Sequence, residues 1–360
     1  MKRLVICMTA HVDAGKTTLT EALLYRAGEI RRLGRVDNGD AFLDTDPQER
    51  SRGITIFSKQ AIMRTDAAEM TLLDTPGHVD FSAEAERALT VPDCAVLVIS
   101  GTDGVQSHTH TLWELLSRFK IPTFVFVNKM DISHRSRAEL LSDLHKLDKR
   151  FADFSDDPAE QCAELDEDCM NALLERSEVP DQLIAAAVSA RNVFPVCFGA
   201  ALRSEGVDKL TELLERFAEP RERYGEFAAL VYKITSDENG ARLTHMKING
   251  GELKNRAVIE QTGEKVTQIR LYSGAKFTAV DRAEAGQLVA VTGLSETFAG
   301  QALGAQKTAA APVIEPVLSY RAELPPGTDV PTTLAKLKKL EEEDPQLRFS
   351  WSEQLGEIHV

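Results

Sequence analysis

The residues with the clearest chemical capacity lie near the N-terminus, where the apolar run LVICM is followed by AHVDAGKTT and then by apolar residues at helical spacing. This order of strand, loop and helix is the context of a phosphate-binding loop, although Ala10 stands where the usual pattern has glycine. Backbone N–H groups of such a loop converge on an anion, and the helix dipole adds to their attraction. Lys16 can then reach two phosphates, and the Thr17 hydroxyl can bind Mg²⁺. The loop residues expected to contact a nucleotide are His11, Val12, Asp13, Ala14, Gly15, Lys16, Thr17 and Thr18.

Two further motifs supply groups for the same metal and phosphates. The sequence DTPGH begins at Asp74, after a second apolar run, and the Asp74 carboxylate can hold Mg²⁺ through a water molecule. The backbone amide of Gly77 can sense a γ-phosphate. The sequence RGIT, which ends at Thr55, lies between these motifs, where a loop that closes over the γ-phosphate is expected. We therefore expect Thr17, Thr55 and Asp74 to be the protein groups around Mg²⁺, the last of them through water.

The fourth motif, NKMD, selects the base. Asn128, Lys129 and Asp131 follow the apolar run TFVFV, so they also lie at the end of a predicted strand. Guanine presents two adjacent donors, N1–H and N2–H, and one carboxylate, that of Asp131, can accept from both. Adenine has an acceptor at N1, which the same carboxylate repels. Because the motifs occur in the order that a GTP switch requires, the sequence predicts a GTP-binding domain with GTP as substrate, GDP as product and Mg²⁺ as cofactor.

The segments that carry these motifs alternate between predicted strands and helices. Residues 96–100 have the pattern of a fully buried strand, and residues 111–116 that of the helix after it. Such alternation predicts an α/β fold, in which a mostly parallel sheet has helices on both faces and ligands bind at the carboxyl ends of the strands. All of the motifs above fall at such ends.

The rest of the sequence divides the chain into three predicted domains. The GTP-binding domain spans residues 1–222 and contains an acidic insertion at about 151–191, which we expect to be helical and solvated. Residues 223–312 have short alternating runs separated by turn residues, which are typical of a small antiparallel β-barrel.

The last segment, residues 313–360, is predicted to be part of an α+β domain. We expect a strand at 317–320 and a second strand near 347–349. Between them, residues 332–343 are predicted to form a helix whose apolar stripe consists of Leu334, Leu337 and Leu340.

Composition limits the classes of partner and compartment. A formal net charge of −14 argues against a protein that coats nucleic acid by bulk electrostatics. The five cysteines form no Cys-x-x-Cys pair, which favours buried thiols in a reducing cytoplasm over a metal site. No run approaches the ~18 apolar residues of a membrane helix. We therefore expect a cytoplasmic monomer that does not associate with membranes.

The motifs AHVDAGKTT, RGITI, DTPGH and NKMD resemble those of the translational GTPases. Within that group the chain is similar to elongation factor G and, more closely, to the ribosomal protection proteins that confer tetracycline resistance. The main reason for preferring the latter is the insertion at 151–191, since the resemblance implies a much larger subdomain there in elongation factor G. The chain ends at Val360, which in the family is the middle of a domain, so we expect an N-terminal fragment.

The resemblance also implies roles for individual residues. His78 matches the catalytic histidine of the family, and Val12 and Ile54 match an apolar pair, the hydrophobic gate, that holds this histidine away until activation. Gly199, Ala200 and Ala201 match a loop that lends backbone amides to guanine O6. Ala200 replaces a serine there, so we expect looser anchoring of the loop without loss of guanine specificity.

Partners are likewise implied by the resemblance. The GTP-binding domain is expected to meet large-subunit ribosomal RNA, which stimulates a slow intrinsic hydrolysis, and the β-barrel is expected to meet the small subunit. Three functions stay open at this point: a ribosome-dependent GTPase that releases tetracycline, an elongation factor G-type translocase, and a GTP-dependent switch or binding module without ribosome-stimulated turnover. The domains that would separate the first two are absent from the sequence.

Overall fold

The computed structural model divides into two compact units. The first comprises Met1–Arg223 together with Tyr272–Phe277, and the second comprises Tyr224–Leu271 and Thr278–Val360. The three-domain division stays a prediction. The residues that the structure describes are 1–34, 41–43, 58–76, 82–221, 223–307, 318–325 and 327–360.

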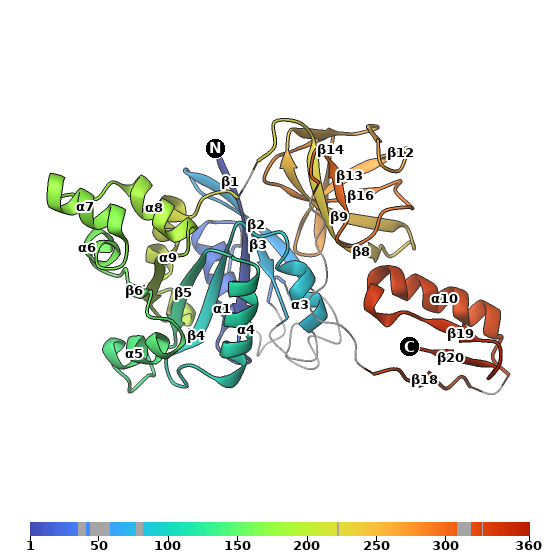
Figure 1. Ribbon diagram of the computed structural model, residues 1–360, viewed down its shortest axis with the longest axis horizontal. Helices are drawn as coiled ribbons and strands as arrows, with labels where there is room; N and C mark the ends of the chain where they lie inside the picture. Colours follow the sequence, from blue (N-terminus) through green and yellow to red (C-terminus); the bar gives the residue numbers. More distant parts are fainter. Residues whose placement is uncertain (35–40, 44–57, 77–81, 222, 308–317, 326) are drawn as a thin grey trace. The chain divides into compact units, whose positions relative to one another are not determined.

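A seven-stranded sheet forms the centre of the first unit (Figure 1). Its strand order is β2-β3-β1-β4-β5-β7-β6, and every neighbouring pair is parallel except β2 and β3. Its central strands are buried along nearly their whole length, as a sheet covered on both faces requires. The strands are β1 (Lys2–Ala10), β2 (Lys59–Arg64), β3 (Ala68–Asp74), β4 (Cys94–Ser100), β5 (Thr123–Asn128), β6 (Phe151–Asp153) and β7 (Phe194–Phe198).

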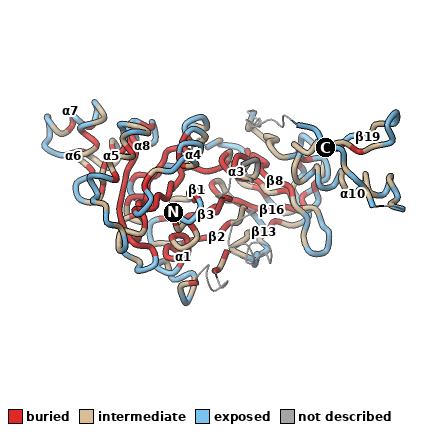
Figure 2. Tube along the Cα trace, turned by 90° about the horizontal axis from the view of Figure 1, so that it is seen from below, coloured by how far each residue is buried: buried red, intermediate tan, exposed pale blue. Residues whose placement is uncertain are grey.

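Helices cover both faces of this sheet, which confirms the predicted α/β fold. One apolar cluster lies between the sheet and α1, α8 and α9, and a second lies between the sheet and α4 and α5. Figure 2 shows the strands as the buried centre of this unit, with exposed residues on the helices around it. The helices are α1 (Lys16–Arg26), α3 (Ser82–Ala88), α4 (Ser107–Arg118), α5 (Arg137–Leu147), α6 (Pro158–Ala163), α7 (Glu167–Arg176), α8 (Asp181–Ser189) and α9 (Val207–Phe217).

The predicted insertion is helical, but it is only partly solvated. It begins with β6, which pairs with β7 at the edge of the sheet, and continues with α6, α7 and α8. Ile184 and Val188 bury α8 in the main core. The Sγ atoms of Cys162 and Cys169 lie 3.2 Å apart and join α6 to α7. These thiols are buried like the other cysteines, which confirms the prediction of buried thiols.

The second unit contains a six-stranded antiparallel sheet in the order β14-β13-β16-β9-β8-β17. Alternate residues of its strands form one apolar cluster that includes Val231, Met246 and Val289. The predicted antiparallel architecture is thus confirmed. The six strands are β8 (Ala228–Ser236), β9 (Arg242–Gly250), β13 (Gln268–Ser273), β14 (Lys276–Val280), β16 (Leu288–Thr292) and β17 (Ala302–Gly304); two short pairs join β10 (Glu252–Lys254) to β15 (Arg282–Glu284) and β11 (Val258–Ile259) to β12 (Glu264–Lys265).

The C-terminal segment of this unit has helix α10 (Val330–Glu343) and a three-stranded sheet of β18 (Arg321–Ala322), β19 (Ser350–Ser352) and β20 (Glu357–His359). The helix confirms the prediction for 332–343.

Two details of the C-terminal prediction were wrong. The first strand begins at Arg321, one residue after the segment 317–320, of which only 318–320 are described. Residues 345–347 form a 3₁₀ turn, because Pro345 favours a turn start, so the next strand begins at Ser350. The predicted apolar stripe lies on α10, of which no residue is buried.

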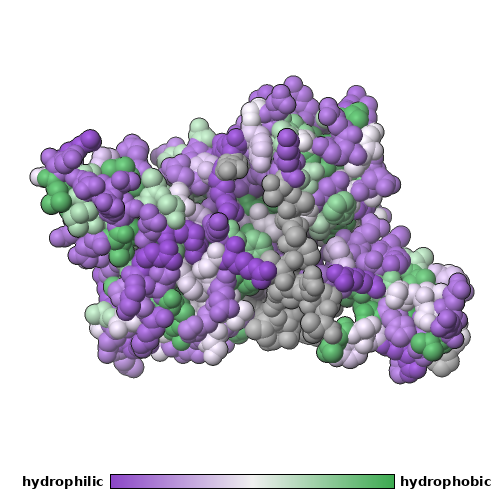
Figure 3. Space-filling model, viewed as in Figure 1, coloured by the Kyte–Doolittle hydropathy of each residue, from purple (hydrophilic) through white to green (hydrophobic). Residues whose placement is uncertain are grey.

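The surface drawn in Figure 3 is mostly polar. On the face drawn in Figure 3 hydrophilic residues predominate, and apolar residues occur as small separate patches. Within the described residues, no helix has both the length and the apolar character needed to cross a membrane.

Candidate nucleotide-binding site

The loop between β1 and α1 has the conformation that its glycine permits. Gly15 precedes the first residue of α1 with φ 90°, in the left-handed region, and Asp13 has φ 63°. A Cβ atom on Gly15 would lie 2.3 Å from Nδ2 of Asn128, so a larger residue cannot occupy this position without displacing that side chain. The Leu19 N–H donates to the Gly15 carbonyl over 2.9 Å, which closes the first turn of α1. The strand, loop and helix predicted here are therefore present.

Lys16 and Asp74 meet behind this loop. The Lys16 Nζ atom is 2.5 Å from Oδ1 of Asp74, and both side chains are buried. Asp74 is the last residue of β3, where it pairs in register with Met8 of β1, so the two strand ends lie side by side. The Thr75 hydroxyl donates to the Met8 carbonyl over 2.8 Å and fixes the chain after β3. A buried charge needs such a partner, because the low-dielectric interior does not solvate it.

Asn128 joins three loops. It is the last residue of β5 and is 3% exposed. Its Nδ2 atom donates to the Ala14 carbonyl over 2.9 Å, and its Oδ1 atom accepts from the Ala201 N–H over 2.9 Å. The phosphate-binding loop, the NKMD segment and the loop after β7 are therefore held together by one amide, whose donor and acceptor are both used.

The loop after β7 is closed by its own backbone. The Ala200 N–H donates to the Glu205 carbonyl over 3.0 Å, and the Glu205 N–H donates back over 3.1 Å. A Cβ atom on Gly199 would lie 2.2 Å from the Glu205 oxygen, so the approach depends on glycine. Main-chain bonds, and the bond from Ala201 to Asn128, hold this loop without a serine hydroxyl, and looser anchoring at Ala200 stays a prediction.

Asp131 lies where the NKMD segment meets the loop after β7. The Met130 N–H donates to the Gly199 carbonyl over 3.0 Å, and Lys129 has φ 62°. The Asp131 side chain is 13% exposed, and its Oδ2 atom is 3.1 Å from Nε of Arg203, a residue of the 3₁₀ turn Ala201–Arg203. Sequence reasoning missed Arg203, because no motif includes it; its place directly after the predicted 199–201 loop was the available signal.

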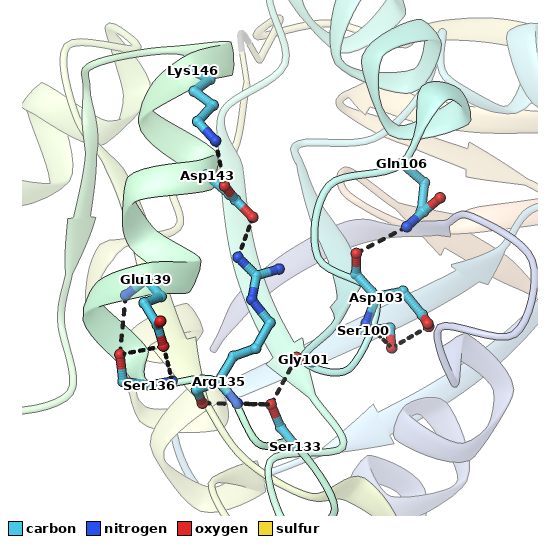
Figure 4. Close-up of polar contacts among 10 residues, drawn as sticks. All are labelled: Ser100, Gly101, Asp103, Gln106, Ser133, Arg135, Ser136, Glu139, Asp143 and Lys146. Atoms are coloured by element: carbon cyan, nitrogen blue, oxygen red, sulfur yellow. Dashed lines mark hydrogen bonds and ion pairs between the residues drawn. The ribbon is translucent and has the colours of Figure 1, made fainter.

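The chain after Asp131 is also fixed (Figure 4). The Ser133 hydroxyl donates to the Gly101 carbonyl over 2.7 Å, which links this segment to the end of β4. Ser136 then caps α5 by accepting from the Glu139 N–H, and the Glu139 carboxylate accepts from the Ser136 N–H over 2.8 Å. Arg135 reaches Asp143 on the same helix. The NKMD segment, which is predicted to recognise the base, is thus followed by an ordered segment rather than by a long free loop.

The His11 side chain is buried at the start of the loop. Its side chain is 8% exposed, and within the described residues Nδ1 has no hydrogen-bond partner. Burial is the main cause that lowers the pKa of His11, with Asp103 opposing it and Lys129 adding to it. The imidazole is therefore neutral near pH 7. Val12, in contrast, is 43% exposed at the surface of the loop.

The structure brings most of the predicted site residues together at the carboxyl ends of the strands. Contacts join Ala14 to Asn128, Asn128 to Ala201, and Lys16 to Asp74. The predicted residues that lie outside the described part of the chain are Ile54, Thr55, Gly77 and His78.

Mg²⁺ is implied by the motifs, and the described residues fit it. Thr17 lies in the first turn of α1, and Asp74 ends the neighbouring strand β3, so a hydroxyl and a carboxylate are presented at one edge of the sheet. Mg²⁺ prefers such oxygen ligands together with water and phosphate, rather than an all-protein cage.

Two protein-family models match the chain. Residues 1–220 match the model described as Elongation factor Tu GTP binding domain, and residues 226–306 match Elongation factor G domain 2. The first match covers more than half of the chain and contains every predicted site residue.

Similar proteins come from several bacteria. Elongation factor G of Dehalococcoides mccartyi (strain ATCC BAA-2266 / KCTC 15142 / 195) is 30% identical over 99% of this chain and 63% of its own length. Elongation factor G 1 of Geobacter sulfurreducens is 29% identical over 98% of this chain and 63% of its own length. A crystal structure of a protein from Thermus thermophilus superposes with a TM-score of 0.87 at 25% identity, over 99% of this chain and 63% of that one. The chain therefore spans less than two thirds of these relatives, and nothing in the comparisons supports the tetracycline-protection subgroup.

Proposed function

We propose that this chain, which belongs to the elongation factor G-like translational GTPases, binds GTP with Mg²⁺ and hydrolyses the γ-phosphate in response to the ribosome. The observation that carries the proposal is the pair of hydrogen bonds by which Asn128 joins the phosphate-binding loop to the two loops of the base site. A binding site that needs phosphate contacts and base contacts at a fixed separation requires such a connection.

The described residues supply most of the binding chemistry. Backbone N–H groups of the 11–15 loop and the N-terminus of α1 face the phosphates, with Lys16 as a fixed positive charge. Asp131 accepts from N1–H and N2–H of guanine, and the Ala200 and Ala201 amides are available to its O6 atom. The Thr17 hydroxyl, and the Asp74 carboxylate through water, would hold a Mg²⁺ ion, which would supply charge neutralisation at the phosphate oxygens. Guanine selectivity then follows from Asp131, since adenine offers no matching donor at N1.

Hydrolysis needs an oriented water molecule and further charge neutralisation. We assign the first role to His78 on the basis of its motif, and we expect the ribosome to activate it. Val12, with its exposed side chain, is available as one half of the proposed hydrophobic gate with Ile54. Intrinsic turnover should accordingly be slow.

A nucleotide-binding experiment tests the first part of the proposal. The purified chain should bind a fluorescent GDP analogue, with competition by GTP and GDP but not by ATP. Asp131→Asn should weaken GDP binding and improve xanthosine diphosphate binding, because an amide can donate to the O2 atom of xanthine. Asp208→Asn, a change in a surface ion pair of α9, is the matched control and should alter neither. Equal affinity of the wild-type chain for ATP and GTP would refute the assignment of Asp131.

Hydrolysis is tested with ribosomes. Phosphate release by the wild-type chain should rise on their addition, and His78→Ala should abolish the rise while changing GTP affinity only a few-fold. A variant with the full stimulated rate would remove His78 from the mechanism. Tight GTP binding without any ribosome response would instead favour a GTP-dependent switch or binding module.

We further propose translocation of the elongation factor G type as the cellular role, because the relatives described above have that name. The alternative is the ribosomal-protection role, which the sequence suggests through the short insertion at about 151–191. A reconstituted peptide-synthesis assay separates the two. Synthesis without elongation factor G supports translocation; GTP-dependent rescue from tetracycline with elongation factor G present supports protection. In either role the chain is expected to act as a cytoplasmic monomer, with the GTP-binding domain at the large-subunit RNA and the antiparallel β domain at the small subunit.

A further inference from the structure

Arg203 lies against the base-recognition carboxylate, although neither the motifs nor the proposed mechanism uses it. Its Nε atom is 3.1 Å from Oδ2 of Asp131, and its side chain is 60% exposed while that of Asp131 is 13% exposed. Exposed ion pairs add little to folding stability, since solvent screens the charges and the side chains lose entropy. The role of this ion pair therefore lies in ligand binding by Asp131 rather than in folding stability.

The backbone of Arg203 is held firmly enough to position another group. Its N–H donates to the Ala200 carbonyl over 2.9 Å, and the next residue, Ser204, turns the chain with φ 58°. The paired backbone of Ala200 and Glu205 closes the loop around this turn. The loop also rests on the NKMD segment, through the bond from Met130 to Gly199. Arg203 and Asp131 thus project from two segments that are fixed to each other.

Asp131 obtains little support from elsewhere in this loop. Ala200, which is buried within the loop after β7, has no side-chain hydroxyl. Within the described part of the chain, Arg203 is the one cationic partner of Asp131. A carboxylate accepts about four hydrogen bonds, so the ion pair leaves both oxygens capable of accepting from guanine.

We propose that Arg203 is a positioning residue for guanine specificity, which holds the Asp131 carboxylate so that its two oxygens face N1–H and N2–H of the base together. The inference rests on the proposed function, because it takes Asp131 as the guanine acceptor. Arg203 lies outside the sequence motifs, and the group on which it acts is the Asp131 carboxylate. Without Arg203 the Asp131 carboxylate can rotate. It can then keep its contact with one of the two guanine N–H groups while it loses the other.

Inosine nucleotides provide the test, because hypoxanthine keeps N1–H and lacks the 2-amino group. The ratio of GDP affinity to IDP affinity therefore measures the second contact alone, and a general loosening of the pocket lowers both affinities equally. Wild-type protein should prefer GDP by about tenfold or more, as expected for a hydrogen bond to a charged group. Arg203→Ala should lower that preference about fivefold, and Arg203→Lys, which keeps the charge, should recover part of it.

Arg26→Ala is the matched control, because Arg26 forms a surface ion pair with Asp208 in the same unit. It should leave the GDP to IDP preference unchanged. Circular dichroism of each variant should match that of the wild-type protein.

The outcomes separate this inference from the proposed function. A reduced preference in Arg203→Ala, with partial recovery in Arg203→Lys, supports the inference. An unchanged preference, or an equal loss of GDP and IDP affinity, overturns it while the proposed function stands. Failure of the wild-type chain to bind GDP refutes the proposed function, and the inference with it.

Discussion

Replacing Asn128 by alanine is the most direct perturbation of the site, because one side chain joins its three loops. Truncation leaves the Ala14 carbonyl and the Ala201 N–H without the partners that Asn128 gives them at 2.9 Å. Each buried polar group left unpaired costs about 1–3 kcal/mol, so Asn128→Ala, which leaves two of them, should lower the free energy of unfolding of the first unit by about 2–6 kcal/mol. GDP affinity should fall at least about tenfold, since the phosphate loop loses its link to the base site.

Asn128→Asp refines this prediction. The carboxylate can still accept from the Ala201 N–H, but it cannot donate to the Ala14 carbonyl and instead repels that oxygen. The aspartate variant should therefore lose at least as much stability as the alanine variant, although it is nearly isosteric. Asn192→Ala is the control, because Asn192 is exposed and its side-chain amide donates to Asp166 at the surface.

The two tryptophans allow the measurement to be assigned to one unit. Trp113 is buried in the first unit, whereas Trp351 lies in the second. In a Trp351→Phe background, urea unfolding followed by fluorescence therefore reports the first unit, and titration with a fluorescent GDP analogue gives the affinity. A loss of less than about 0.5 kcal/mol in Asn128→Ala, the size of an ordinary surface substitution, together with unchanged GDP affinity, would refute the reasoning.

Two further predictions concern the phosphate-binding loop. Gly15→Ala should abolish measurable GDP binding, because its Cβ atom would lie 2.3 Å from Asn128 Nδ2. Gly28→Ala is the control: Gly28 has a similar positive φ of 77° and open space around it, so this variant isolates the backbone cost of about 1–2 kcal/mol. Equal losses of GDP affinity in both variants would exclude the contact with Asn128 as the cause. For His11 the pKa is lowered by burial, so the unfolded state binds the proton first and stability falls as pH drops below about 6.5, by up to about 1.4 kcal/mol per pH unit. His11→Asn should flatten this dependence between pH 7.5 and 5.5 in urea titrations; an identical slope in both proteins would contradict the burial argument.

Much of the site was predictable from the sequence because its geometry follows from strand ends. Lys16, Asp74 and Asn128 each begin or end a regular element, and parallel strands place such positions at one edge. Arg203 was not predictable, since its contact with Asp131 depends on how two loops fold over each other.

Arg191 shows the same limit in the core. Sequence patterns assign arginine to the surface, yet Arg191 is buried and its guanidinium carbon lies 5.3 Å from the Trp113 ring centre and 4.9 Å from that of Phe194. It donates to the carbonyls of Leu116 and Ile121, which replaces lost hydration, while burial lowers its pKa to about 10. Contacts of this kind come from distant segments of the chain, so they leave no periodic pattern in the sequence.

The position of Asn128 has a consequence for how nucleotide binding is organised. Its Nδ2 atom holds the phosphate-binding loop, and its Oδ1 atom holds the loop that faces the base. Because both bonds come from one planar amide, its orientation cannot adapt to one loop without disturbing the other. If Asp131 binds the base as we propose, base recognition and phosphate binding are geometrically coupled. A nucleotide with the wrong base would then lose its contacts at Asp131 and also disturb the phosphate loop, so discrimination would exceed the value of the base contacts alone.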